Sequence, residues 1–225
     1  MTFGAKEALH ACDAIVGYKS YIKTISDFSQ GKEVFQFGMR KEIERCRKAI
    51  ELAKEGKLVA LISSGDPGIY GMAGLVLELG SAEKDIDIEV LPGVSAVNAA
   101  ASALGAPLMH DFAVISLSDL LTPWEKIEKR LRSAATADFV TALYNPKSTK
   151  RNWQIRTAWD IFMQYRNPRT PVGLYAKNNG EQLYQITDLA SFIELPIGMN
   201  TTIIIGNSQT YVAGGRMITP RGYRI

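Results

Sequence analysis

Short continuous apolar runs alternate along the chain with longer segments in which apolar residues recur every three or four positions. The first pattern is typical of strands buried on both faces of a parallel sheet, and the second is typical of amphipathic helices. Residues 58–63 are the clearest strand, and residues 39–55, which Gly56 follows, are the clearest helix. The same rules predict strands at residues 14–16, 34–37, 86–91, 113–116, 139–143, 172–175 and 201–205. They predict helices at residues 1–12, 69–79, 95–104, 123–131 and 153–165, and the alternation as a whole predicts an α/β fold.

Two of the predicted strands end in turns rich in glycine and proline. Residues 63–71 read SSGDPGIYG after one strand, and residues 92–96 read PGVSA after another. Ligands of open α/β sheets bind outside the carboxyl ends of the strands, so both turns are candidate sites by position as well as by composition. The alternative is that they only connect strands to helices, with Asp66 and Ser95 as helix caps.

The segment LGAPLMHDF at residues 104–112 has the composition of a linker. We therefore expect two domains, residues 1–111 and 112–225. His110 lies in this linker, where it could shuttle a proton or anchor the loop, and the sequence shows no partner for it.

Composition and charge exclude several classes of protein. With 225 residues and 46% hydrophobic content, the chain can bury a substantial core. Its net charge is only +3 and its basic residues are interleaved with acidic ones, so nucleic acid is not an expected partner. Cys12 and Cys46 have no metal-binding spacing, so no protein-bound metal is expected. The sequence lacks both an apolar run long enough to span a membrane and the layout of a signal peptide, which indicates a cytoplasmic protein without membrane contact.

The segments SSGDPGIYG and PGVSA, and the spacing between them, resemble two signatures of the tetrapyrrole methylase family. Members of that family use S-adenosylmethionine to methylate macrocycles derived from uroporphyrin. The resemblance implies two consecutive α/β domains with a cofactor cleft between them, and a homodimer. It also implies that the cofactor is held by two groups of residues, which are Gly65, Asp66, Ile69, Ser95 and Ala96 in the first domain and Tyr144, Asn145, Ala176 and Lys177 in the second.

One feature departs from the family pattern. A first strand and a GxGPG loop normally precede the first helix of these proteins, and neither is present before Met1. We therefore expect an unfilled strand position in the sheet of the first domain.

Longer segments resemble one branch of the family, namely LMHDFAVISLSDLLTPWEKIEKRL, LYNPKS, IIIGNSQTY and MITPRGY. This branch methylates carbon 17 of a precorrin-3B or cobalt-factor III macrocycle and contracts the ring during cobalamin biosynthesis. The resemblance implies that residues 116–119 and 207–208 face the macrocycle. Its carboxylates could pair with Lys19, Lys147, Lys150 and Arg151. A general acid or base could come from Asp66, His110, Ser118 or Asp119.

Other functions remain open at this level. The chain could be another methylase of the family, such as a uroporphyrinogen or diphthine methyltransferase, or a catalytically silent cofactor-binding module if the amino-terminal loop is truly absent. A dinucleotide-binding oxidoreductase has a similar alternation of strands and helices. The sequence disfavours it, because Gly65, Gly68, Gly71 and Gly74 are three residues apart and do not form GxGxxG.

Overall fold

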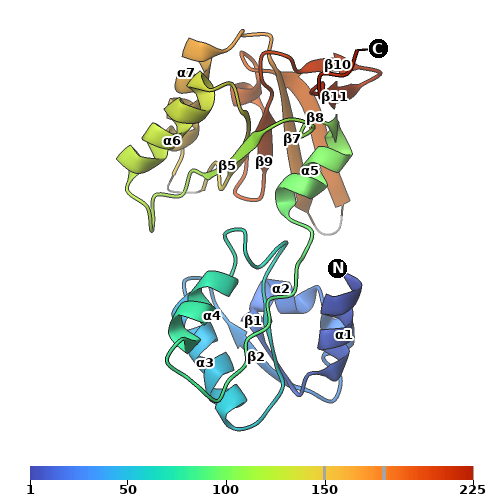
Figure 1. Cartoon of the computed structure of the whole chain (residues 1–225), viewed down its shortest axis with the longest axis vertical. Coiled ribbons are helices and arrows are strands. Elements are labelled where there is room, and N and C mark those ends of the chain that lie inside the picture. Colours follow the sequence, from blue (N-terminus) through green and yellow to red (C-terminus); the bar gives the residue numbers. More distant parts are fainter. Residues whose placement is uncertain (149–150, 179–180, 225) are drawn as a thin grey trace. The chain divides into compact units, whose positions relative to one another are not determined.

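The computed structural model describes residues 1–148, 151–178 and 181–224. The chain divides into two compact units, Met1–Ala96 and Val97–Ile225, and each is described by itself (Figure 1). This division falls at the first residue of helix α5 (Ala96–Leu104), whereas the predicted domain boundary follows that helix. The reason is packing, because Val97, Ala100 and Leu104 of α5 are buried against side chains of the second unit.

The first unit is built around a parallel sheet in the order β2-β1-β3. Its central strand β1 contributes Ala14, Ile15 and Val16, which have no exposed surface. Helices cover both faces of the sheet (Figure 1). The elements are α1 (Phe3–Ala11), β1 (Ala14–Tyr18), α2 (Lys19–Lys23), η1 (Ser26–Phe28), β2 (Glu33–Phe37), α3 (Glu42–Lys54), β3 (Val59–Ile62) and α4 (Ala73–Gly80).

The two cysteines belong to the packing of this unit. Cys12 and Cys46 are both buried as free thiols. Burial raises the pKa of the Cys46 thiol to about 11, so this side chain stays protonated at neutral pH. Their role as core residues agrees with their lack of any metal-binding spacing.

The strand predicted at residues 86–91 does not form, and that prediction is wrong. Residues 86–95 have no regular secondary structure, although Ile88 still packs near Gly80 of α4. A strand needs a neighbour for its backbone hydrogen bonds, and the alternating pattern of apolar residues does not supply one. Within the described ranges, β3 pairs with β1 alone. The expectation of an unfilled strand position in this sheet stays a prediction.

The second unit contains a mixed sheet in the order β5-β6-β9-β7-β8. Strands β5 and β6 are parallel, β9 is antiparallel to both β6 and β7, and β8 forms a hairpin with β7. A smaller sheet has the order β10-β11-β4. After α5, the elements are β4 (Gly105–Ala106), β5 (Phe112–Ser116), α6 (Trp124–Thr136), β6 (Val140–Tyr144), α7 (Trp153–Tyr165), β7 (Pro171–Asn178), β8 (Glu181–Asp188), η2 (Phe192–Glu194), β9 (Thr202–Ile205), β10 (Tyr211–Ala213) and β11 (Arg216–Ile218).

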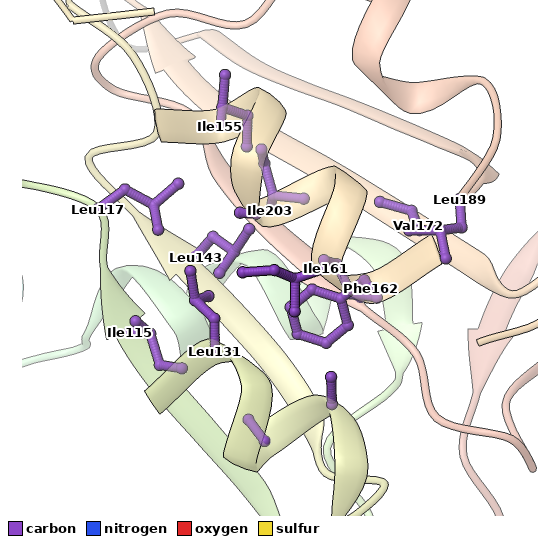
Figure 2. Close-up of a cluster of buried hydrophobic side chains, with 14 of the residues drawn as sticks. Ile115, Leu117, Leu131, Leu143, Ile155, Ile161, Phe162, Val172, Leu189 and Ile203 are labelled. Carbon is purple, nitrogen blue, oxygen red and sulfur yellow. The ribbon is translucent and has the colours of Figure 1, made fainter. Parts of the chain in front are cut away.

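Helices also cover both faces of this larger sheet. Helices α6 and α7 pack on one face, where Leu131 and Phe162 point toward Leu143 of β6 and Ile203 of β9 (Figure 2). Helix α5 packs on the other face so closely that a Cβ at Gly173 of β7 would overlap the Leu104 side chain. The structure therefore confirms the predicted α/β fold class. None of the described helices is long and apolar enough to cross a membrane.

Strand β7 extends beyond the strand predicted at residues 172–175. Ala176 and Lys177 continue β7 and pair with Leu183 and Gln182 of β8. Asn179 and Gly180 lie outside the described residues. The strand is longer than its apolar run because its extension depends on a partner strand that is mostly exposed.

Candidate functional site

In the first unit, the side chain of Asp66 joins the two glycine-rich turns. Its Oδ1 accepts a hydrogen bond from Gly68 N at 2.8 Å, and its Oδ2 accepts one from Gly93 N at 3.0 Å. The hydrogen bonds from Gly93 and Gly68 lower the pKa of Asp66, so its carboxylate is ionised at neutral pH. An ionised carboxylate with both oxygens engaged by backbone amides holds the turns together and is poorly suited to act as a general acid.

Glycine is required in these turns for two different reasons. Gly65 has a φ of +67°, in the left-handed region, and a Cβ there would make ordinary contact with Val94 O at 3.5 Å. A Cβ at Gly93 would instead overlap the carbonyl oxygen of Gly65. Sequence reasoning did not single out Gly93 as a site residue, although the Pro-Gly pair that contains it is a turn signal.

The structure brings together the cofactor residues predicted in the first unit. Ala96 N lies 3.7 Å from the position that a Cβ of Gly65 would occupy. Ser95 is buried beside the same turn, and Ile69 N donates to Asp66 O at 3.2 Å. The predicted residues of this unit therefore form one surface at the carboxyl end of β3.

In the second unit, the remaining predicted cofactor residues lie along one edge of the large sheet. This edge is formed by the ends of the strands and not by an outermost strand. Ile203 of β9 pairs with Leu143 on one side and with Leu174 on the other. Since β9 is antiparallel to both neighbours, β6 and β7 run in the same direction. Tyr144 and Asn145 therefore lie at the same end of the sheet as Ala176 and Lys177, with β9 between the two pairs.

Hydrogen bonds fix the shape of this edge. Tyr144 Oη accepts from Val97 N, in the first turn of α5, at 2.7 Å. Asn145 has a φ of +51°, and its Nδ2 donates to Ser116 Oγ, at the end of β5, at 2.9 Å. Ser118 N also donates to Ser116 Oγ, at 3.2 Å. The loops after β5 and β6 are thus tied together.

A second set of polar side chains supports the same two loops. Arg151 Nη1 donates to Leu117 O at 2.9 Å and to Asn145 O at 3.3 Å. Gln154 Nε2, in the first turn of α7, donates to Asp119 Oδ2 at 3.0 Å. Arg151, predicted to pair with a ligand carboxylate, thus uses Nη1 to hold the protein backbone. Among the other predicted cations, Lys19 begins α2, Lys147 follows β6, and Lys150 lies outside the described residues.

His110 does not share this edge with the other candidate acids and bases of the second unit. It precedes β5, whereas Ser118 and Asp119 follow it, so the length of the strand separates them. His110 is exposed, and its Nδ1 accepts a hydrogen bond from Asp111 N at 2.9 Å. This contact is local to its own loop.

Residues 207–208 lie at the opposite end of the sheet from residues 116–119. Ser208 N donates to Asp138 Oδ1 at 3.0 Å, and Asp138 lies just before the start of β6. Asn207 Oδ1 accepts from Gln209 N within its own turn. The expectation that both segments face one macrocycle is therefore wrong, because β9 runs antiparallel to β6. The turn-forming roles of serine and asparagine account for residues 207–208.

Two residues of this edge were not singled out from the sequence. Gln154 carries a weak signal, since it shares the apolar face of α7 with Ala158 and Ile161, four and seven residues later. Thr201, next to the start of β9, is buried at the same edge as Tyr144. Among the described residues, there is no group of histidine, cysteine, aspartate or glutamate side chains that could hold a metal ion.

Comparison with known proteins places this arrangement in a family. The family model described as Tetrapyrrole (Corrin/Porphyrin) Methylases matches residues 1–179. The chain belongs to this family. The resemblance inferred from the two glycine-rich turns is therefore confirmed.

Individual tetrapyrrole methylases give a more detailed picture. The chain is 51% identical to a protein of Salmonella typhimurium named probable cobalt-factor III C(17)-methyltransferase, and the match covers 100% of the chain and 94% of that protein. It is 48% identical to the cobalt-factor III methyltransferase of Priestia megaterium over 100% of the chain, but it covers only 43% of that longer protein.

Solved structures agree with this placement. The crystal structure of the methyltransferase CobJ has a TM-score of 0.91 and 36% identity, and the match covers 98% of this chain and 93% of that one. A uroporphyrin-III C-methyltransferase from Thermus thermophilus, complexed with S-adenosylhomocysteine, has a TM-score of 0.69 at 20% identity. That match covers 92% of this chain and 86% of the Thermus protein, and it extends the likeness in fold to a distant relative.

Proposed function

We propose that this chain is an S-adenosylmethionine-dependent methyltransferase that methylates carbon 17 of the cobalt-factor III macrocycle in cobalamin biosynthesis. The observation that carries the proposal is the 51% identity to the Salmonella protein of that name over the whole of this chain. The high TM-score with CobJ supports it independently. We further propose that methylation accompanies ring contraction, with extrusion of carbon 20 and formation of a lactone. The homodimer implied by the family resemblance stays a prediction.

The glycine-rich turns of the first unit fit a cofactor that lies against backbone. Gly65 and Gly93 add no side chains of their own where the turns meet, and Asp66 fixes both turns through their amides. S-adenosylmethionine, when bound, supplies a methyl group on a sulfonium that is already electrophilic, so the protein mainly has to position it. We propose that it is held by Gly65, Asp66, Ile69, Ser95, Ala96, Tyr144, Asn145, Ala176 and Lys177.

The loop after β5 is the part of the second unit that we assign to the macrocycle. Ser118 and Asp119 extend past the end of β5, and Asp119 keeps 28% of its side chain exposed. Of the candidate acids and bases, these two share an edge with Tyr144 and Asn145. Asp66 is engaged by backbone amides and His110 lies at the other end of β5. We therefore propose that proton transfer in the reaction uses Ser118 or Asp119.

The proposal is tested by comparing two macrocycles. The purified protein is incubated with S-adenosylmethionine and either cobalt-factor III or uroporphyrinogen III, and the products are identified by mass spectrometry. We expect methylation of cobalt-factor III and none of uroporphyrinogen III. Methylation of uroporphyrinogen III alone would assign the chain to another activity of the family, and cofactor binding without methylation of either macrocycle would make it a silent binding module.

A further inference from the structure

Gln154 combines near-complete burial with an incomplete set of hydrogen bonds. Only 1% of the residue is exposed. Its Nε2 donates to Asp119, but its Oε1 is buried and has no hydrogen-bond partner among the described residues. A buried acceptor without a donor destabilises a folded protein. An apolar side chain of similar shape would avoid this cost, so stability alone does not explain a glutamine at this position.

The contact that Gln154 does make orients a carboxylate at the edge of the site. Gln154 Nε2 donates to Asp119 Oδ2 at 3.0 Å, and Arg151 Nε forms an ion pair with Asp119 Oδ1 at 3.9 Å, which is beyond hydrogen-bonding distance. The Asp119 carboxylate is thus held by a hydrogen bond through one oxygen and by a longer charge contact through the other. The second oxygen, Oδ1, keeps the capacity to accept a hydrogen bond.

We propose that Gln154 is a positioning residue for the macrocycle. It acts through Asp119, by fixing this carboxylate so that Oδ1 faces the bound macrocycle. The inference rests on the proposed function, because the macrocycle is the molecule that Asp119 would contact. It adds a buried residue of α7 to a site otherwise made of turns and strand ends.

The test is a double-mutant cycle built on Gln154→Met and Asp119→Ala. Methionine is similar in length and flexibility to glutamine and removes both amide groups. Gln164→Met is the matched control, because Gln164 is exposed on the same helix. For each variant we would measure kcat/KM for cobalt-factor III, the dissociation constants of the macrocycle and of S-adenosylmethionine, and the thermal unfolding midpoint.

We expect Gln154→Met to lower kcat/KM by roughly tenfold or more, the change that corresponds to loss of a hydrogen bond to a charged group. Its unfolding midpoint should change little, because removal of the unpaired Oε1 offsets loss of the hydrogen bond to Asp119. Its affinity for S-adenosylmethionine should not change. Asp119→Ala should lower kcat/KM at least as much. The double variant should be no worse than Asp119→Ala, because Gln154 acts through that carboxylate.

Three results would overturn the inference: unchanged kcat/KM in Gln154→Met, additive losses in the double variant, or a lower unfolding midpoint with a matching loss of cofactor affinity. The last result would give Gln154 a purely structural role. The test also separates this inference from the proposed function. If the unchanged protein does not methylate cobalt-factor III, the proposed function fails, and the macrocycle dissociation constant then tests Gln154. Equal macrocycle affinity in the unchanged protein and in Gln154→Met would contradict the inference in that case.

Discussion

At the scale of single residues, the carboxylate of Asp66 stabilises the first unit by accepting backbone hydrogen bonds from two turns. Because these bonds lower its pKa in the folded state, its contribution is complete at pH values above the ordinary aspartate pKa. The contribution is lost as the pH falls through the lowered pKa.

An Asp66→Asn variant tests this role through its pH dependence. The amide oxygen of asparagine can accept one of the two hydrogen bonds, but its NH2 group would face the other backbone N–H. We expect the variant to unfold at a lower temperature than the unchanged protein at neutral pH, and the difference to shrink below about pH 4. Thermal unfolding followed from pH 3 to pH 7 measures it. A difference that is the same at every pH would contradict this role for the charge.

Gly65 offers a direct test of the cofactor assignment. Leucine at this position would be strained by roughly 1–2 kcal/mol and would place a side chain where the two turns meet. Gly31 is a suitable control, because its φ of +75° imposes similar strain while no atom lies within 4 Å of its would-be Cβ. We expect Gly65→Leu to abolish binding of S-adenosylmethionine in calorimetric titrations and Gly31→Leu to retain it. Equal affinity in the two variants would remove Gly65 from the site.

Sequence reasoning could identify Gly65, Asp66 and Ser95 because a glycine-rich turn after an apolar strand is a local pattern. It could not assign the role of Arg151, whose guanidinium holds the carbonyl groups of Leu117 and Asn145. An arginine that stays in solvent and one that donates to backbone carbonyl groups cannot be told apart by their sequence pattern. The contact of Gln154 with Asp119 likewise joins elements that are 35 residues apart.

At the scale of elements, the two ends of the large sheet have different roles. Asp119 lies at the end where β5 and β6 finish, whereas Ser208 lies at the other end and its Oγ donates to Asp138 Oδ2 at 2.6 Å. Asp138 in turn pairs with the buried Arg166. The Ser208 end is therefore a structural junction.

Alanine substitutions at the two ends should separate activity from stability. We expect Asp119→Ala to lower turnover of the macrocycle and to leave cofactor affinity nearly unchanged. Ser208→Ala should leave both unchanged and lower the free energy of unfolding by about 1 kcal/mol, the value of one hydrogen bond. Steady-state kinetics, cofactor titration and urea unfolding measure the three quantities. Loss of turnover in Ser208→Ala without loss of stability would contradict the assignment of the two ends.

Apolar runs predicted strands β1, β3, β6 and β9 well, and helical spacing predicted the full extent of α7. Edge strand β8 was missed, because its residues are mostly exposed and alternate weakly. The segment 86–91 shows the reverse error, since a good strand pattern forms no strand without a neighbour. Pairing between distant segments decided both cases. The direction of β9, which places residues 207–208 away from residues 116–119, is also a property of pairing.

At the scale of the whole molecule, two α/β units each place their candidate site residues at strand ends. In the first unit this is the pair of glycine-rich turns, and in the second it is the edge formed by β5, β6 and β7. The family could be recognised from the sequence because its signatures are contiguous segments. The limits of the two units depend on packing, because α5 joins the second unit through its buried side chains rather than through any break in composition.

The carbon that receives the methyl group distinguishes the proposed activity from those of other tetrapyrrole methylases. It can be located by NMR in the product formed from cobalt-factor III and S-adenosylmethionine labelled with ¹³C in its methyl group. We expect a single labelled methyl on carbon 17 of a ring that has lost bridging carbon 20 and carries a lactone. A label on any other ring carbon, or on an intact ring, would contradict it.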